Sequence, residues 1–255
     1  MALVLFMSLR GEQIVKRFFD KYFWRQHPEA ALRYFLVADE IKKRNLQNSK
    51  ILEVGPGSLG IIPYLKINID GIDIDFSGPR TSLLRKIKGK ADKLPFKKND
   101  YDVVISVDVL EHIDPGIREK AIYEMLKVAK KLAVLVVPCG EESEIQDKKL
   151  QQRWNNLFSR KNQFLDEHVK YGLPRVEEIL VFVDRSLRKL NKQAKISSKP
   201  NLNLSIRNVL MTTWITKNKF LYYLYLKGFL LFLSILKHCN FGKTYRRVFV
   251  IEFAS

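Results

Sequence analysis

The apolar positions of this chain follow two different periods, and the period changes near Lys50. Between Gly11 and Asn45, apolar residues recur at the three- and four-residue spacing of an amphipathic helix. This apolar stripe consists of Val15, Phe18, Phe19, Tyr22 and Phe23. Pro28 can begin a second helix, because the first turn of a helix does not need the N–H that proline lacks. We therefore expect residues 1–48 to form a helical cover over the rest of the molecule.

After Lys50 the apolar residues come in short continuous runs, which are typical of buried strands in a parallel sheet. Four such runs are KILEV from 50, INIDGIDID from 67, YDVVISVDVL from 101 and LAVLVVP from 132. Between the last two, the segment 114–131 has the spacing of a helix. Its apolar face consists of Ile117, Ala121, Ile122, Met125 and Val128. Strands that alternate with helices predict an α/β fold around a parallel sheet.

The pattern changes again after Pro138. The polar stretch CGEESEIQDKK (139–149) is expected to be a loop, and RVEEILVFVDRSLRKL (175–190) to be a helix. KQAKIS (192–197) predicts a weak strand, and the alternating TYRRVFVIEF (244–253) a strand that returns to the sheet edge. This organisation predicts a core over 49–140, a helical lid insertion over the substrate at 141–243, and an edge strand at 244–255 that completes the sheet.

The stretch ILEVGPGSLG (51–60) follows the first predicted strand and has the spacing G-x-G-x-x-G. Gly55 and Gly57 let a ligand approach the backbone closely, and the N–H groups of a following helix favour negative charge. Glu53 stands two residues before Gly55, where a carboxylate would repel a pyrophosphate and suit a cofactor that carries a cation. Asp73 lies at the distance expected for a carboxylate that binds ribose hydroxyls.

Two further segments, ADKLPF (91–96) and DYDVVISVDVLEHI (100–113), complete a series of four in a fixed order. The series resembles the class I S-adenosylmethionine-dependent methyltransferases, in particular the methyltransferase type 11 group, from Ile51 to Pro138. The resemblance implies a Rossmann-like parallel sheet with a final antiparallel strand, helices on both faces and a helical lid insertion. It also implies that residues 49–140 bind S-adenosyl-L-methionine and that the protein is a methyltransferase.

The resemblance assigns cofactor contacts residue by residue. Glu53 would lie near the cationic methionine part, Gly55 and Gly57 in the loop, and Asp73 at the ribose. Ala91 and Asp92 match the segment along the adenine. One position departs from the family pattern: Lys90 stands where an aspartate commonly accepts from the adenine amino group, and lysine has no acceptor. Either Asp92 accepts in its place, or the backbone and Leu94 hold the adenine.

Two histidines are candidates for the chemistry of methyl transfer. If the acceptor is a hydroxyl, a general base helps, and His112 and His168 are the candidates; each could equally have a structural role. Asp108, Glu111 and His112, with His168 downstream, also resemble the acidic-x-x-Glu-His arrangement of small-RNA 2′-O-methyltransferases. That resemblance implies a bound Mg²⁺ or Mn²⁺ as an alternative to a site without metal.

The charge of the chain bears on its partners. The formal net charge is +18, and no Asp or Glu occurs from 185 to 250, which favours an anionic neighbour. The apolar run Phe220 to Leu236, interrupted by Lys227, is shorter than the about 20 residues that span a bilayer. It fits a lid over the substrate, or a helix lying in an anionic membrane surface. Its aromatic residues cluster with leucines, which makes nucleic acid the less favoured partner.

The remaining expectations concern compartment and function class. Cys139 and Cys239 have no disulfide or metal-ligand pattern, which favours a reducing cytoplasm, with membrane association as an option. The start MALVLFMSLRGEQ has too short an apolar run, and no basic residue before it, for a signal peptide. We expect a methyltransferase acting on a small molecule, lipid or glycan, preferably at a hydroxyl. The alternatives are a metal-dependent RNA 2′-O-methyltransferase and a membrane-surface binding protein with a degenerate fold, which Lys90 would favour.

Overall fold

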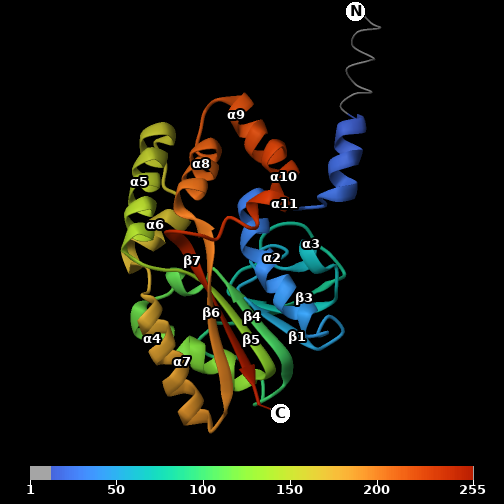
Figure 1. Ribbon diagram of the computed structural model, residues 1–255, viewed down its shortest axis with the longest axis vertical. Coiled ribbons are helices and arrows are strands. Elements are labelled where there is room, and N and C mark those ends of the chain that lie inside the picture. The colour runs from blue at the N-terminus through green and yellow to red at the C-terminus, as the bar shows by residue number, and fades with distance from the viewer. Residues whose placement is uncertain (1–12, 255) are drawn as a thin grey trace, which may run out of the picture.

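A computed structural model describes residues 13–254 of the chain. Within that range a seven-stranded sheet has the order β3-β2-β1-β4-β5-β7-β6 (Figure 1). Its strands are β1 (Ile51–Val54), β2 (Ile69–Asp73), β3 (Leu84–Lys88), β4 (Tyr101–Val107), β5 (Ala129–Pro138), β6 (Ala194–Asn203) and β7 (Thr244–Phe253). The first five strands are parallel, and β7 is antiparallel to both of its neighbours. This confirms the expected mixed sheet with a final antiparallel strand.

The last strand does not lie where we expected it. Residues 244–255 were predicted as the sheet edge, but Arg246 pairs with Pro138 of β5 on one side and with Asn201 of β6 on the other. The prediction was wrong because β6, which the sequence indicated only weakly, extends over ten residues and takes the edge itself. Strand β7 is therefore covered on both sides, and its side chains are largely buried.

Helices cover both faces of the sheet. They are a helix over 13–22, α2 (Pro28–Lys43), α3 (Ile62–Leu65), α4 (Pro115–Val128), α5 (Glu141–Phe158), α6 (Gln163–Tyr171), α7 (Val176–Leu190), α8 (Leu204–Trp214), α9 (Lys219–Tyr223), α10 (Phe229–Leu231) and α11 (Leu233–Leu236). Val104 of β4 packs in the core layer beneath α4 and α7, whereas its neighbours Val103 and Ile105 pack in the layer beneath α2. This alternation is the period of two expected of a strand with helices on both faces.

Helix α5 and strand β3 are among the elements that were not predicted from the sequence. Helix α5 begins within the stretch 139–149, which we expected to be a loop. The helix buries few of its side chains, so its sequence has no strong apolar stripe. Three glutamates in its first turn favour the helix through its dipole. Strand β3, LRKIK, has one fully buried residue, Leu84. It is the other edge of the sheet, where basic side chains are common because they prevent pairing with another chain.

Only part of the predicted insertion 141–243 lies outside the core of the domain, and its role as a lid stays a prediction. Helix α7 and strand β6 belong to the core layers. Helices α8–α11 join the end of β6 to the start of β7, next to the carboxyl end of β5 (Figure 1). The run Phe220 to Leu236 is not one regular helix, because a π-helical turn (Leu224–Gly228) separates α9 from α10.

Over the described residues, the structure contains no helix that meets the length and hydropathy needed to cross a membrane. The apolar start of the chain, which we considered as a signal peptide, lies almost wholly at residues 1–12, outside the described residues.

Candidate active site

The glycine loop after β1 packs against Val109 at Gly55 and has open space at Gly57. Gly55 has φ +77°, and a Cβ there would lie 2.3 Å from Cγ2 of Val109. Gly57 has φ +59°, and a Cβ there would meet nothing within 4 Å. Both conformations favour glycine. The loop therefore contacts the segment after β4 through Gly55 and leaves space for a ligand at Gly57.

Glu53 is turned into the protein. It is fully buried, accepts from the Tyr34 hydroxyl (2.7 Å) and accepts from the backbone N–H of Ile61 (2.9 Å). A Cβ on Gly60 would lie 2.0 Å from its Oε2, so this third glycine makes room for the carboxyl group. Burial raises the pKa of Glu53 to about 7, against the lowering effect of the Tyr34 and Ile61 hydrogen bonds. Its expected place near the methionine part of the cofactor stays a prediction.

Asp73 is the last residue of β2 and faces the glycine loop. Its Oδ2 accepts from the backbone N–H of Gly57 at 2.8 Å, so loop and carboxylate form one unit at the carboxyl ends of β1 and β2. Ligands in such sheets bind there.

The residues expected to contact the adenine differ in their burial and in their neighbours. Leu94 is buried in the hydrophobic core, Ala91 is half-buried against that core, and Asp92 lies 3.5 Å from the Lys120 ammonium. Lys90 forms an isolated β-bridge with Lys93. The adenine contacts of these residues stay predictions.

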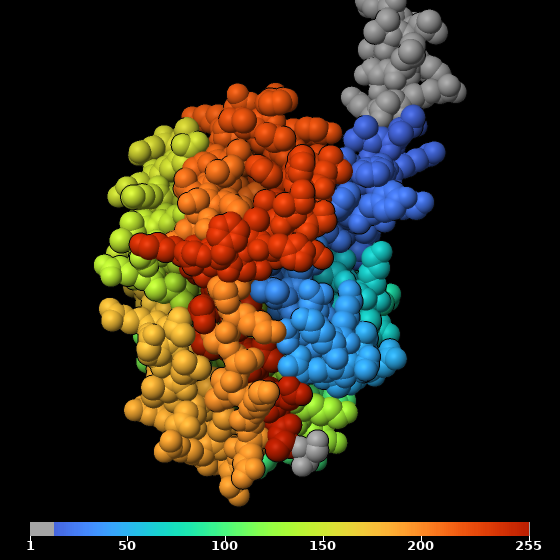
Figure 2. All heavy atoms as spheres, viewed as in Figure 1, coloured from blue at the N-terminus to red at the C-terminus, as the bar shows by residue number. Residues whose placement is uncertain are grey.

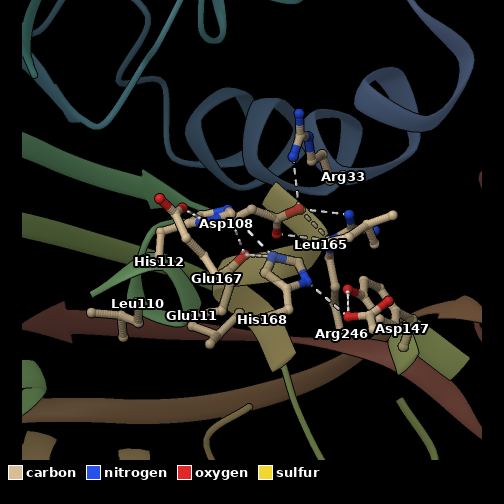
Figure 3. A network of polar contacts seen from close by, with 12 residues as sticks. Arg33, Asp108, Leu110, Glu111, His112, Asp147, Leu165, Glu167, His168 and Arg246 are labelled. Atoms are coloured by element: carbon tan, nitrogen blue, oxygen red, sulfur yellow. Dashed lines mark hydrogen bonds and ion pairs between the residues drawn. The ribbon is translucent and has the colours of Figure 1, made fainter. Parts of the chain in front are cut away.

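The two candidate histidines lie together. His112 closes the 3₁₀ turn Leu110–His112 after β4, His168 lies on α6, and their Nε2 atoms are 3.3 Å apart (Figure 3). The Nδ1 of His112 is 2.7 Å from Glu167 Oε2, and the Nδ1 of His168 is 2.8 Å from Asp147 Oδ2. A carboxylate at Nδ1 holds the proton on that nitrogen, so each Nε2 presents a lone pair to the shared space.

Glu111 completes this group, which we call the Glu–His–His centre (Glu111, His112 and His168). Its Oε1 lies 3.9 Å from Nε2 of His112 and 4.0 Å from Nε2 of His168. The side chain is fully buried, and neither oxygen has a hydrogen-bond partner among the described residues. Burial, followed by the charge of Asp108, holds the pKa of Glu111 well above its usual range. One ligand atom from each of the three residues lies within 4.8 Å of the others.

The electrostatics of His112 agree with that geometry. Burial, and then the neighbouring His168, lower the pKa of His112 to about 4, although Glu167 acts in the opposite direction. The ring is therefore neutral at physiological pH, and its Nε2 can accept a proton or bind a cation.

Asp108, the fourth residue of the predicted metal set, is not in the Glu–His–His centre. It follows β4 with φ +52° and accepts from Arg33 of α2 (2.7 Å) and from Nε of Arg246 of β7 (2.8 Å). Arg246 also pairs with Glu29 at the start of α2. The side chains of Asp108 and Arg246 are only 7% and 3% exposed. This ion-pair cluster joins α2, β4 and β7 beside the centre (Figure 3).

Several residues of the site were missed by sequence reasoning. Asp147 orients His168 and also binds the Tyr245 hydroxyl (2.6 Å) and the Arg207 guanidinium (2.8 Å). It lies in the stretch that we expected to be a loop. Glu167, which orients His112, is the immediate neighbour of His168 in the sequence, and this adjacency was the one available signal.

Comparison with known proteins finds one family model that matches the part of the chain with the glycine loop and His112. A family model described as a methyltransferase domain matches residues 52–137. A ketol-acid reductoisomerase (NADP⁺) of Buchnera aphidicola is 33% identical over 120 residues, which cover 42% of this chain and 24% of that protein. An uncharacterized protein of Methanocaldococcus jannaschii is 31% identical over 140 residues, which cover 48% of this chain and 60% of that protein. The chain thus spans less than two thirds of either curated relative.

Solved structures agree with the family match at the level of the fold. An S-adenosylmethionine-dependent methyltransferase of Thermotoga maritima is 17% identical with a TM-score of 0.50, covering 96% of this chain and 97% of that one. A methyltransferase assigned to antibiotic biosynthesis in Anabaena variabilis is 14% identical with a TM-score of 0.50, covering 86% and 98%. Residues 52–137 therefore match a methyltransferase domain, and the fold of the chain is similar to that of S-adenosylmethionine-dependent methyltransferases.

Proposed function

We propose that the protein transfers a methyl group from S-adenosylmethionine to a hydroxyl of a small molecule, lipid or glycan. The observation that carries this proposal is the pair of imidazoles whose Nε2 atoms face the buried Glu111 carboxyl group. Both rings are oriented from behind by carboxylates. Because these carboxylates hold the protons on Nδ1, the Nε2 of either ring can take the proton of a bound hydroxyl.

The residues of the cofactor loop fit the cofactor. Gly57 leaves open space where a side chain would point, and Asp73 supplies a carboxylate beside it for ribose hydroxyls. Bound S-adenosylmethionine supplies a methyl group activated on a sulfonium. Because Val109 contacts Gly55 and the Glu–His–His centre begins two residues later, the loop and the centre are neighbours. The chain orients the acceptor hydroxyl, and Nε2 of His112 or His168 takes its proton.

The cofactor part of the proposal is tested by replacing Asp73. Titration with S-adenosylhomocysteine should show binding to the wild type that falls about 10- to 100-fold in Asp73→Ala, because the variant lacks the ribose acceptor. Asp75→Ala, two residues further along, is the matched control and should keep most of the affinity. NADP⁺ and NAD⁺ are run as competing ligands. Tight NADP⁺ binding without S-adenosylhomocysteine binding would contradict the proposal.

The second candidate is a divalent-metal-dependent 2′-O-methyltransferase of RNA, which the Glu–His–His centre favours. Two imidazoles with carboxylates behind them and an unpartnered carboxylate are the donors that transition metals and zinc accept. Mn²⁺ suits this set better than Mg²⁺, which prefers oxygen ligands. Glu111, His112 and His168 would hold the ion, which would favour the alkoxide form of a bound hydroxyl.

Metal dependence separates the two candidates. If the ion is required, we expect His112→Ala with His168→Ala to abolish Mn²⁺ binding by calorimetry and to lower methyl transfer to RNA by at least about a hundredfold. His238→Ala, on the loop after α11, is the control. Unchanged activity in the presence of a chelator, with a hydroxyl acceptor other than RNA, would remove this candidate and keep the first.

A further inference from the structure

Two segments that are far apart in the sequence form one end of the molecule. Phe19 of the helix over 13–22 packs in one hydrophobic cluster with Tyr225, Leu230 and Leu233. The Lys227 ammonium lies 4.6 Å from the centre of the Phe19 ring. Figure 1 shows this helix beside α10 and α11, at the end of the molecule that carries the lid. We call the outer face of the helix over 13–22 and of residues 217–237 the apical surface.

The apical surface exposes large apolar side chains that are not packed in the core. Phe220 is 72% exposed, Ile14 67% and Ile235 64%. Phe18, Tyr22 and Phe232 are also exposed. Single exposed apolar residues are common on proteins, but a gathering of them at one end marks an interaction site. In the space-filling view this end is convex and lacks a deep groove on the face shown (Figure 2).

The same surface is strongly basic. Residues 13–25 and 217–237 contain eight basic residues and a single acidic one, Asp20. The basic residues are Lys16, Arg17, Lys21, Arg25, Lys217, Lys219, Lys227 and Lys237. Aromatic and aliphatic side chains with flanking lysines are the composition of segments that lie in the interface of anionic bilayers.

We propose that the apical surface binds peripherally to an anionic phospholipid membrane. Its apolar tips would enter the boundary between headgroups and acyl chains, and its lysines would contact the headgroup phosphates. A second copy of this chain fits less well, because two surfaces of the same high charge repel each other. RNA fits less well because the exposed aromatic side chains lie among exposed isoleucine and leucine side chains, whereas single strands stack on aromatics that line a basic groove.

A series of contacts connects the apical surface to the ion-pair cluster beside the candidate active site. The Tyr225 hydroxyl lies 2.9 Å from Nδ1 of His27, which precedes the helix that carries Arg33, the partner of Asp108. Membrane contact at this end would bring the protein to a lipid surface, which deepens the proposed function toward a lipid acceptor. The binding itself does not depend on methyl transfer and is tested separately from it.

The test is cosedimentation of the full chain with vesicles. We expect binding to mixed phosphatidylcholine–phosphatidylglycerol vesicles, weak binding to phosphatidylcholine alone, and loss of binding as salt rises. The double variant Phe232→Asp/Ile235→Asp should lower the partition coefficient about tenfold or more, and so should Lys217→Glu/Lys219→Glu. The matched controls Val181→Asp on α7 and Lys195→Glu on β6 should bind like the wild type. Circular dichroism establishes that each variant is folded.

Four outcomes would overturn the proposal. The first is no binding to the anionic vesicles at low salt, and the second is equal loss in the control variants. The third is a wild-type dimer in solution that the apolar variants convert to monomer. The fourth is competition by an RNA oligonucleotide whose binding needs the lysines but not the apolar residues. Because S-adenosylhomocysteine binding is measured on the same variants, failure of membrane binding is distinguished from failure of the cofactor site.

Discussion

Replacing Asp108 by alanine should lower the free energy of unfolding by about 3–5 kcal/mol, because it removes the carboxylate shared by the buried Arg246 and the partly buried Arg33. The Arg246 side chain is only 3% exposed, and Asp108 is its partner through two nitrogens. Arg33 donates to the same carboxylate. Removing one partner of a buried ion pair costs far more than the pair contributes, since the remaining charge cannot return to water.

Urea unfolding followed by far-UV circular dichroism measures the effect. Asp108→Asn keeps an acceptor and should lose less than Asp108→Ala. The control is Asp102→Ala, which breaks a surface pair with Lys131 (3.1 Å) and should cost less than about 1 kcal/mol. Equal losses in Asp108→Ala and Asp102→Ala would show that the cluster does not behave as a buried one.

The pH dependence of the Asp108 effect has a defined sign. Burial alone would raise the pKa of Asp108, but Arg246 and Arg33 hold it well below its usual range. The stabilisation is therefore complete above the ordinary aspartate pKa and is lost only as the pH falls through the lowered value. The difference between wild type and variant should therefore shrink in acid, as the pH falls below the ordinary aspartate pKa.

The second large expected effect concerns Glu53, whose contribution to stability should be lost as the pH rises, whereas that of Asp108 is lost as the pH falls. Its pKa is about 7 in the folded protein because the carboxyl group is buried, against about 4.5 in the unfolded chain. The protonated form is thus favoured by folding. Its contribution is complete below the unfolded pKa and disappears as the pH rises through 7. The loss amounts to about 3 kcal/mol between pH 4.5 and 8.

Glu53→Gln separates this contribution from other titrating groups. The amide stays neutral and keeps an oxygen that can accept from Tyr34 or Ile61, so the variant should resemble the wild type near pH 4.5. At pH 8 it should be more stable by up to about 3 kcal/mol. Urea unfolding at several pH values gives both profiles, and Glu141→Gln, at an exposed position of α5, is the control. Parallel profiles for wild type and Glu53→Gln would contradict the expectation.

Both expectations concern residues whose neighbours the sequence does not reveal. Asp108 belonged to the alternative metal set that the resemblance implied, but Arg33 and Arg246 bind its carboxylate. Those arginines lie 75 and 138 residues away along the chain. The expected place of Glu53 near the methionine part of the cofactor stays a prediction, but its hydrogen bonds with Tyr34 and Ile61 were not predicted.

The sequence by itself determined the features that depend on neighbours along the chain. The strand runs, the helices α2, α4 and α7, and the glycine loop with Asp73 follow from local periodicity and spacing. These patterns can be recognised in the sequence because a few neighbouring residues decide strand burial and tight turns. The weakly apolar α5 and the basic edge strand β3 carry no such pattern, and their assignment required the finished sheet.

Only the tertiary structure decided which side chains meet. It placed β7 inside the sheet, because β6 pairs with its outer side. It brought His168 to His112 and supplied Asp147 and Glu167 behind them. It also joined the helix over 13–22 to the lid across some two hundred residues. Contacts of this kind are selected by the packing of whole layers and by the pairing of buried charges, which local spacing does not encode.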